Sequence, residues 1–155
     1  MPTLQFADVR RLVTRLLLPL CAVMLAGVAP AVAGAGTLSP DDEKQIIAVV
    51  QSQLDAFAAD DAEKAFSYAA PNIRALLGNA QNFLEMVRSQ YDIVVHPVSV
   101  VFLKPQGDRA DSVLKVQLTD EDGDVWTATY TLQRQKNKLW RITGCVIAEA
   151  LGKMV

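Results

Sequence analysis

The sequence predicts an α+β domain in which N-terminal helices pack on an antiparallel sheet. Two observations lead to this class. Between Ser39 and Tyr91 the apolar residues recur at spacings of three and four, the period of an amphipathic helix, and from Val94 onward they alternate as in a strand. Because the helices come before the strands, the order favours α+β over the alternating units of a parallel sheet.

Residues 1–33 have the composition of an export signal. A basic segment over residues 10–15 contains three arginines, an apolar run over residues 16–28 follows, and small residues end the segment at Ala31-Val32-Ala33. This order predicts a signal peptide that is cleaved before Gly34. An uncleaved membrane anchor is the alternative, and in both cases the domain lies outside the cytoplasm.

We therefore expect a periplasmic or secreted protein. Residues 34–38 are predicted to form a flexible lead-in, and residues 39–155 a single domain that is long enough to bury its own core. Contact with a membrane is expected only through an uncleaved leader. The formal net charge is −2 and no basic patch occurs, so nucleic acid is not an expected partner.

The first helix is expected to begin sharply at Ser39. Serine is a good N-cap, Pro40 suits the first turn, and three acidic residues follow at the positive end of the helix dipole. One apolar face of this helix is expected to pack on the core. It carries Ile46, Val50, Leu54 and Phe57.

Three further helical segments are expected before the sheet. Asp60 and Glu63 have capping-box spacing and begin a helix that runs to about Tyr68. Residues 72–77 form another helical turn, and Asn79 caps the helix that follows. The inward side chains of that helix are Phe83, Met86, Val87 and Tyr91.

The alternating pattern predicts strands over the second half of the domain. The first strand alternates through Val94, His96, Val98, Val100 and Phe102. A second strand covers residues 113–118, and Asp122-Gly123 is a hairpin turn signal. The hairpin over residues 125–147 completes the sheet and contains both tryptophans.

The register of this last hairpin decides which of its side chains are buried. A three-residue turn at Lys136-Asn137-Lys138, with Asn137 left-handed, would place both apolar sets on one face. The buried face then holds Trp126, Tyr130, Leu132, Trp140, Ile142 and Val146. The outer face holds Thr127, Thr129, Thr131, Arg141, Thr143 and Cys145. Cys145 is then a candidate intermolecular thiol, with a half-buried, inert thiol as the alternative.

Several segments spread over the expected domain carry a family resemblance. They are residues 53–57, 60–62, 65–66, 70–71, Phe83, 86–88, Tyr91, Trp126, Tyr130 and 140–145. Together they resemble an uncharacterised bacterial exported family, domain of unknown function 4864. The order of elements is similar to the nuclear transport factor 2-like superfamily, a cone of helices packed into a curved sheet. That superfamily contains isomerases, dehydratases and non-catalytic modules, so the resemblance implies a fold and no reaction.

Two functions are compatible with these patterns. The leading expectation is a non-catalytic exported module that binds a small apolar ligand or a protein partner, because the predicted inward strand positions contain no Asp or Glu. The alternative is a small isomerase, dehydratase or cyclase that uses His96, Tyr130 and Asp55. The candidate pocket residues are Phe57, Tyr91, His96, Trp126 and Tyr130.

No metal or cofactor is expected. The chain has one histidine, and residues 34–155 contain one cysteine, so a ligand cluster is missing. Asp120, Asp122 and Asp124 loosely resemble a calcium loop, but the twelfth position is Thr131 instead of glutamate, which favours an acidic hairpin turn. The outer face of the sheet is a candidate homodimer surface.

Overall fold

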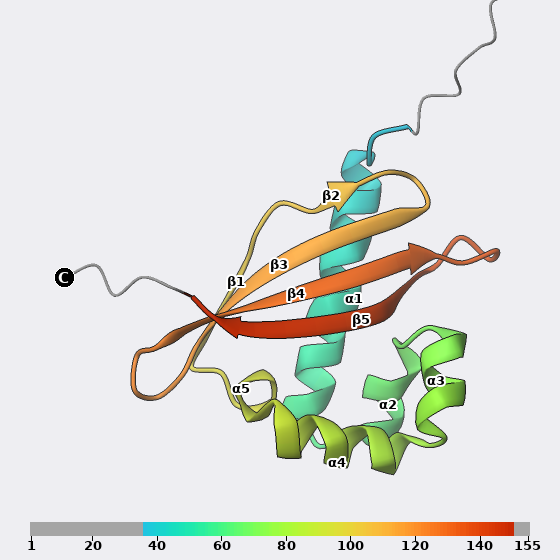
Figure 1. Cartoon of the computed structure of the whole chain (residues 1–155). Helices are drawn as coiled ribbons and strands as arrows, with labels where there is room; N and C mark the ends of the chain where they lie inside the picture. The colour runs from blue at the N-terminus through green and yellow to red at the C-terminus, as the bar shows by residue number, and fades with distance from the viewer. Residues whose placement is uncertain (1–35, 151–155) are drawn as a thin grey trace, which may run out of the picture. The chain divides into compact units, whose positions relative to one another are not determined.

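The structure, a computed structural model, describes residues 36–150. Within this range the helices come first: α1 (Pro40–Ala58), α2 (Ala62–Ser67), α3 (Pro71–Leu77), α4 (Ala80–Gln90) and α5 (Asp92–Val95). The strands follow: β1 (Ser99–Phe102), β2 (Gln106–Gly107), β3 (Asp111–Thr119), β4 (Val125–Arg134) and β5 (Trp140–Glu149) (Figure 1). The predicted α+β class is confirmed. The signal peptide predicted over residues 1–33 lies outside the described residues.

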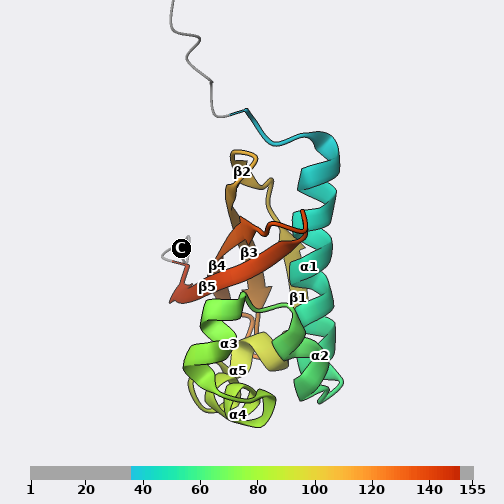
Figure 2. The ribbon, with the colours of Figure 1, turned by 90° about the vertical axis from the view of Figure 1, so that its right-hand side faces the viewer.

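The strands form one antiparallel sheet in the order β1-β3-β4-β5, and β2 pairs with the beginning of β3. The sheet twists and curves across α1, while α2, α3 and α4 gather at one end of it (Figures 1 and 2). Helices packed on a curved antiparallel sheet are therefore confirmed. Among the described residues, no helix combines the length and the apolar character that a membrane span requires.

Helix α1 begins as the sequence predicts. The Ser39 hydroxyl accepts the Asp42 backbone N–H at 3.1 Å, and the Asp42 carboxylate accepts the Ser39 N–H at 3.3 Å, which completes a capping box. The predicted apolar face is buried in the core. It consists of Ile46, Val50, Leu54 and Phe57.

Asp42 also joins the start of α1 to the last hairpin. Trp140 Nε1 donates to its carboxylate at 3.4 Å, and Arg134 Nη1 lies 3.2 Å from the same oxygen. The Ser39 hydroxyl, with the Trp140 N–H and the Arg134 charge, lowers the pKa of Asp42 despite its burial. This polar group therefore stabilises the packing of α1 on β5 as an ionised carboxylate.

The start of α2 differs by one residue from the prediction. Asp61 is the N-cap, and its side chain accepts a backbone N–H of the first turn at 3.0 Å. Asp60 instead adopts a left-handed φ of 63° and forms an ion pair with Arg88. The later boundaries follow the sequence, because Gly78 ends α3 with a φ of 81° and Asn79 caps α4.

The strand predicted from Val94 is wrong in its first half. Residues 92–95 form α5, and β1 begins only at Ser99. Over so short an apolar run, a buried helical turn and a strand have the same pattern. His96 ends α5, and its side chain is 68% exposed, so its predicted inward position is wrong as well.

Near its turn, the last hairpin buries the face that the sequence predicts. The turn lies between the paired residues Arg134 and Trp140, and Lys138, not Asn137, has a positive φ of 66°. Leu132 pairs with Ile142. Both of these side chains and Trp140 are buried, which confirms that the two apolar sets share one face there.

A β-bulge then changes the register. Thr143 has no partner opposite, and Tyr130 pairs with Cys145. Cys145 therefore lies on the inner face beside Tyr130, and Val146 points outward with 69% of its surface exposed. The predicted positions of both residues are wrong, because one extra residue moves every later side chain of β5 to the opposite face.

Candidate functional site

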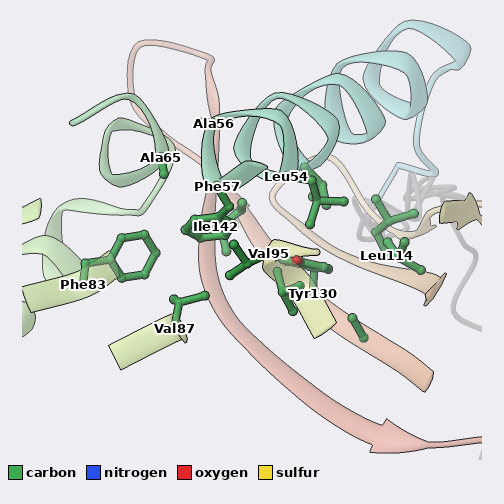
Figure 3. Packing of buried hydrophobic residues seen from close by; sticks show 14 of the residues in the cluster. Leu54, Ala56, Phe57, Ala65, Phe83, Val87, Val95, Leu114, Tyr130 and Ile142 are labelled. Atoms are coloured by element: carbon green, nitrogen blue, oxygen red, sulfur yellow. The ribbon is translucent and has the colours of Figure 1, made fainter. Parts of the chain in front are cut away.

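An apolar cavity of about 250 Å³ lies where α1, α3, α4 and α5 meet β4 and β5. Its wall consists of Gln53, Phe57, Ala69, Ile73, Leu76, Leu77, Phe83, Met86, Val87, Tyr91, Val94, Tyr130, Ile142, Gly144, Cys145 and Ile147. Figure 3 shows several of these side chains directed into a common interior, among them Phe57, Val87 and Ile142. None of these described lining residues is Asp, Glu, Lys, Arg or His.

Helical spacing positions two of the walls. Gln53 and Phe57 lie one turn apart on α1, and Phe83, Met86 and Val87 lie three and four positions apart on α4. The Phe57 and Phe83 rings are in contact, with their centroids 5.6 Å apart. The core therefore fixes these walls in place.

Helix α3 forms the most exposed wall. It has no buried residue, and its lining side chains are Ile73, Leu76 and Leu77. Just before it, the Ala70 N–H donates to the Ile142 carbonyl at 2.8 Å. Leu76 lines the cavity and is also 80% exposed, so the cavity reaches the protein surface at α3.

The sheet contributes Tyr130 and Cys145, which are paired across β4 and β5. Tyr130 is 1% exposed, and its hydroxyl has no hydrogen-bond partner among the described nitrogen and oxygen atoms. The group beside it is the Cys145 thiol, a weak donor and acceptor. Burial raises the pKa of Tyr130 well above its usual value and that of Cys145 to about 12, so both groups are neutral near pH 7.

The sequence model of a family described as Domain of unknown function (DUF4864) matches residues 39–155. The chain belongs to this family. The match covers every described helix and strand, so the whole wall of the cavity lies within the DUF4864 domain. No curated protein matches the chain.

The structure places the pocket candidates of this DUF4864 chain in two separate sites. Phe57, Tyr91 and Tyr130 line the apolar cavity. His96 and Trp126 line a different, acidic hollow. His96 is separated from the cavity because it ends α5 and does not lie on the strand that was expected to direct it inward.

The acidic hollow is built from ordinary turn contacts. Trp126 Nε1 donates to Asp120 Oδ2 at 2.8 Å, and this bond lowers the pKa of that carboxyl group. His96 Nδ1 lies 3.4 Å from Asp92 Oδ1. Among the residues that the structure describes, no group of three His, Cys, Asp or Glu side chains is arranged to hold a metal ion.

The three residues of the enzyme alternative do not converge. Asp55 is exposed, and its carboxylate accepts the Gln51 side-chain amide at 2.7 Å. His96 lies in the acidic hollow and Tyr130 in the apolar cavity. A substrate in the cavity would therefore contact the tyrosine without the carboxylate or the imidazole.

The sequence pattern did not place two polar residues, Gln53 and Cys145, in the cavity wall of the DUF4864 domain. Gln53 is buried one turn before Phe57, and its Nε2 donates to the Ala65 carbonyl at 3.1 Å. A glutamine that interrupts an apolar helix face was the available signal for it. Gly144, a glycine within a strand, was the signal for the bulge that turns Cys145 inward.

Proposed function

We propose that this chain is an exported, non-catalytic domain that binds a small apolar ligand in the cavity beside α3. The composition of the wall carries this proposal, because its side chains are apolar except for Gln53, Tyr91, Tyr130 and Cys145. Concave, mostly apolar sites with a few polar groups are typical small-molecule sites. The volume of about 250 Å³ is slightly below their usual range of about 300–1,000 Å³, which favours a small ligand.

The titratable groups of the wall favour binding over catalysis. General acid–base catalysis needs a group whose pKa lies near the working pH. The pKa of Cys145 is raised to about 12 and that of Tyr130 is raised well above its usual value. The isomerase or dehydratase alternative also needs His96 and Asp55, and neither lines the cavity.

The proposal also includes an origin and a compartment. The curved sheet and the cavity between it and the helices support membership in the nuclear transport factor 2-like superfamily, and the composition of residues 1–33 supports export by a bacterium. Expression of the full chain in a bacterial host tests the export. We expect a periplasmic protein whose measured mass corresponds to a chain that begins at Gly34. A cytoplasmic protein that keeps residues 1–33 would contradict this part of the proposal.

A fluorescence titration with the apolar dye phenylnaphthylamine tests the cavity. Leu76→Asp places a charge at the opening without disturbing the core, because Leu76 is 80% exposed. Leu139→Asp is the matched control, since Leu139 is 47% exposed and does not line the cavity. We expect Leu76→Asp to weaken dye binding by about tenfold and Leu139→Asp to leave it unchanged. No dye binding, or equal binding by both variants, would contradict the proposed site.

A further inference from the structure

We infer that the cavity selects a neutral ligand with one hydrogen-bonding oxygen, a carbonyl or a hydroxyl, which contacts the Tyr130 hydroxyl. This inference rests on the proposed function and adds the chemical class of the ligand. Tyr130 is 1% exposed and lines the cavity, and its hydroxyl has no hydrogen-bond partner among the described nitrogen and oxygen atoms. Since buried polar groups are nearly always hydrogen-bonded, this exception points to a partner outside the chain.

The neighbouring polar side chains do not replace that partner. Cys145 faces Tyr130 across the strand pair and its thiol interacts with the hydroxyl, but sulfur is a weak donor and acceptor. The amide nitrogen of Gln53 already donates to the Ala65 carbonyl at 3.1 Å. A phenylalanine would fill the apolar space equally well, so the hydroxyl has a desolvation cost that the protein alone does not offset. A ligand oxygen that accepts the Tyr130 O–H would offset it.

The charge of the wall determines the charge of the ligand. None of the described lining residues is Lys, Arg or His, so a carboxylate beside Tyr130 would be buried without a counter-charge. The phenol and the Cys145 thiol are themselves neutral, which suits a neutral hydrogen bond. The rest of the wall, including Phe57 and Ile142, is apolar and suits a hydrocarbon skeleton.

The two ends of the cavity also orient the ligand. Tyr130 lies on β4, inside the sheet, whereas the cavity reaches the surface at α3, where Leu76 is exposed. The ligand oxygen is therefore expected at the sheet, and the hydrocarbon skeleton toward α3.

Calorimetric titration with three bicyclic probes tests the inference. The probes are tetralin, a hydrocarbon; tetralone, its ketone; and tetralin carboxylate, an anion at neutral pH. Tyr130→Phe removes only the hydroxyl, and we expect it to shift the ratio of the tetralone and tetralin dissociation constants by about tenfold, at the expense of tetralone. Tyr68→Phe is the matched control, because Tyr68 is a partly buried tyrosine that does not line the cavity. It should leave the ratio unchanged.

The outcomes separate this inference from the proposed function. If tetralin and tetralone bind and the ratio is the same in Tyr130→Phe, the inference is wrong and the apolar site stands. If neither probe binds, both are wrong. Tighter binding of the carboxylate than of the ketone would also overturn the inference. Thermal unfolding should give Tyr130→Phe a Tm no lower than that of the original protein, and a lower Tm would show that the hydroxyl is already bonded within the chain.

Discussion

Replacing Trp140 with alanine is expected to lower the free energy of unfolding by about 3–5 kcal/mol. Trp140 is 1% exposed at the start of β5. Its Nε1 donates to Asp42 at 3.4 Å, and the Arg134 guanidinium carbon lies 6.0 Å from the centre of its ring. The substitution therefore removes a large buried side chain and one of the donors to a buried carboxylate.

Trp140→Phe separates these two contributions. Phenylalanine keeps much of the buried ring and lacks the indole N–H, so its cost should be about 1–3 kcal/mol, the range for a lost hydrogen bond to a charged group with some repacking. A domain of this size is stable by about 5–15 kcal/mol. The alanine variant is therefore expected to keep a folded state whose loss of stability is measurable.

Urea unfolding followed by far-ultraviolet circular dichroism measures both variants, because this signal does not depend on the tryptophan that is removed. Val146→Ala is the matched control in the same strand. Val146 is 69% exposed, and we expect its truncation to cost less than about 0.5 kcal/mol. A loss below about 1 kcal/mol for Trp140→Ala, or equal losses for Trp140→Ala and Trp140→Phe, would refute the placement of Trp140 in the core.

Three further predictions follow from individual groups. The folded pKa of Asp42 is lowered from 3.8, so its ionised form adds stability above pH 3.8 that is lost as the pH falls through the lower folded value. Urea unfolding at several pH values should therefore show a shallower loss of stability in acid for Asp42→Asn than for the original protein, and equal slopes would contradict this prediction. Because the pKa of Cys145 is about 12, we expect its thiol to react slowly with dithionitrobenzoate in the folded protein and quickly in urea. A non-reducing gel should show no disulfide-linked dimer. Fast labelling of the folded protein would contradict this prediction. Gly107→Ala should lower the free energy of unfolding in urea by more than about 1 kcal/mol, because the φ of Gly107 is 138° and the added Cβ would lie 2.2 Å from the Asp111 carbonyl oxygen. Gly123→Ala should lower it less, because Gly123 has a φ of 80° and open space around the added Cβ.

The helical half of the fold was predictable because its signals are local. Ser39 and Asn79 cap the helices that they were expected to cap, and Gly78 ends α3. Each of these residues acts through the backbone of its own turn, so no distant contact is needed to interpret it. The N-cap of α2 is Asp61 and not the predicted Asp60. The two adjacent aspartates are both suitable caps, so a boundary error of one residue is expected.

The cavity was less predictable because its composition depends on long-range packing. Tyr130, Tyr91 and Phe57 were expected as pocket residues from their apolar stripes, and they do line it. Cys145 depends on a one-residue bulge, which the alternation of β5 does not reveal. His96 depends on whether the preceding run is a helical turn or a strand, and burial of Val94 is compatible with both.

The two ends of the cavity differ in how tightly they pack against the rest of the domain, and this difference affects how the cavity would select a ligand. Tyr130 lies on β4, which is paired with β3 on one side and β5 on the other. Helix α3 has no buried residue, whereas each of the other lining helices, α1, α4 and α5, has at least two. Elements with few buried contacts are the ones that open most easily. Ligand entry should therefore cost least at α3, where Leu76 distinguishes ligands only by apolar contact. Discrimination between ligands of similar size then depends on the fixed end, where one hydroxyl is either bonded or left without a partner.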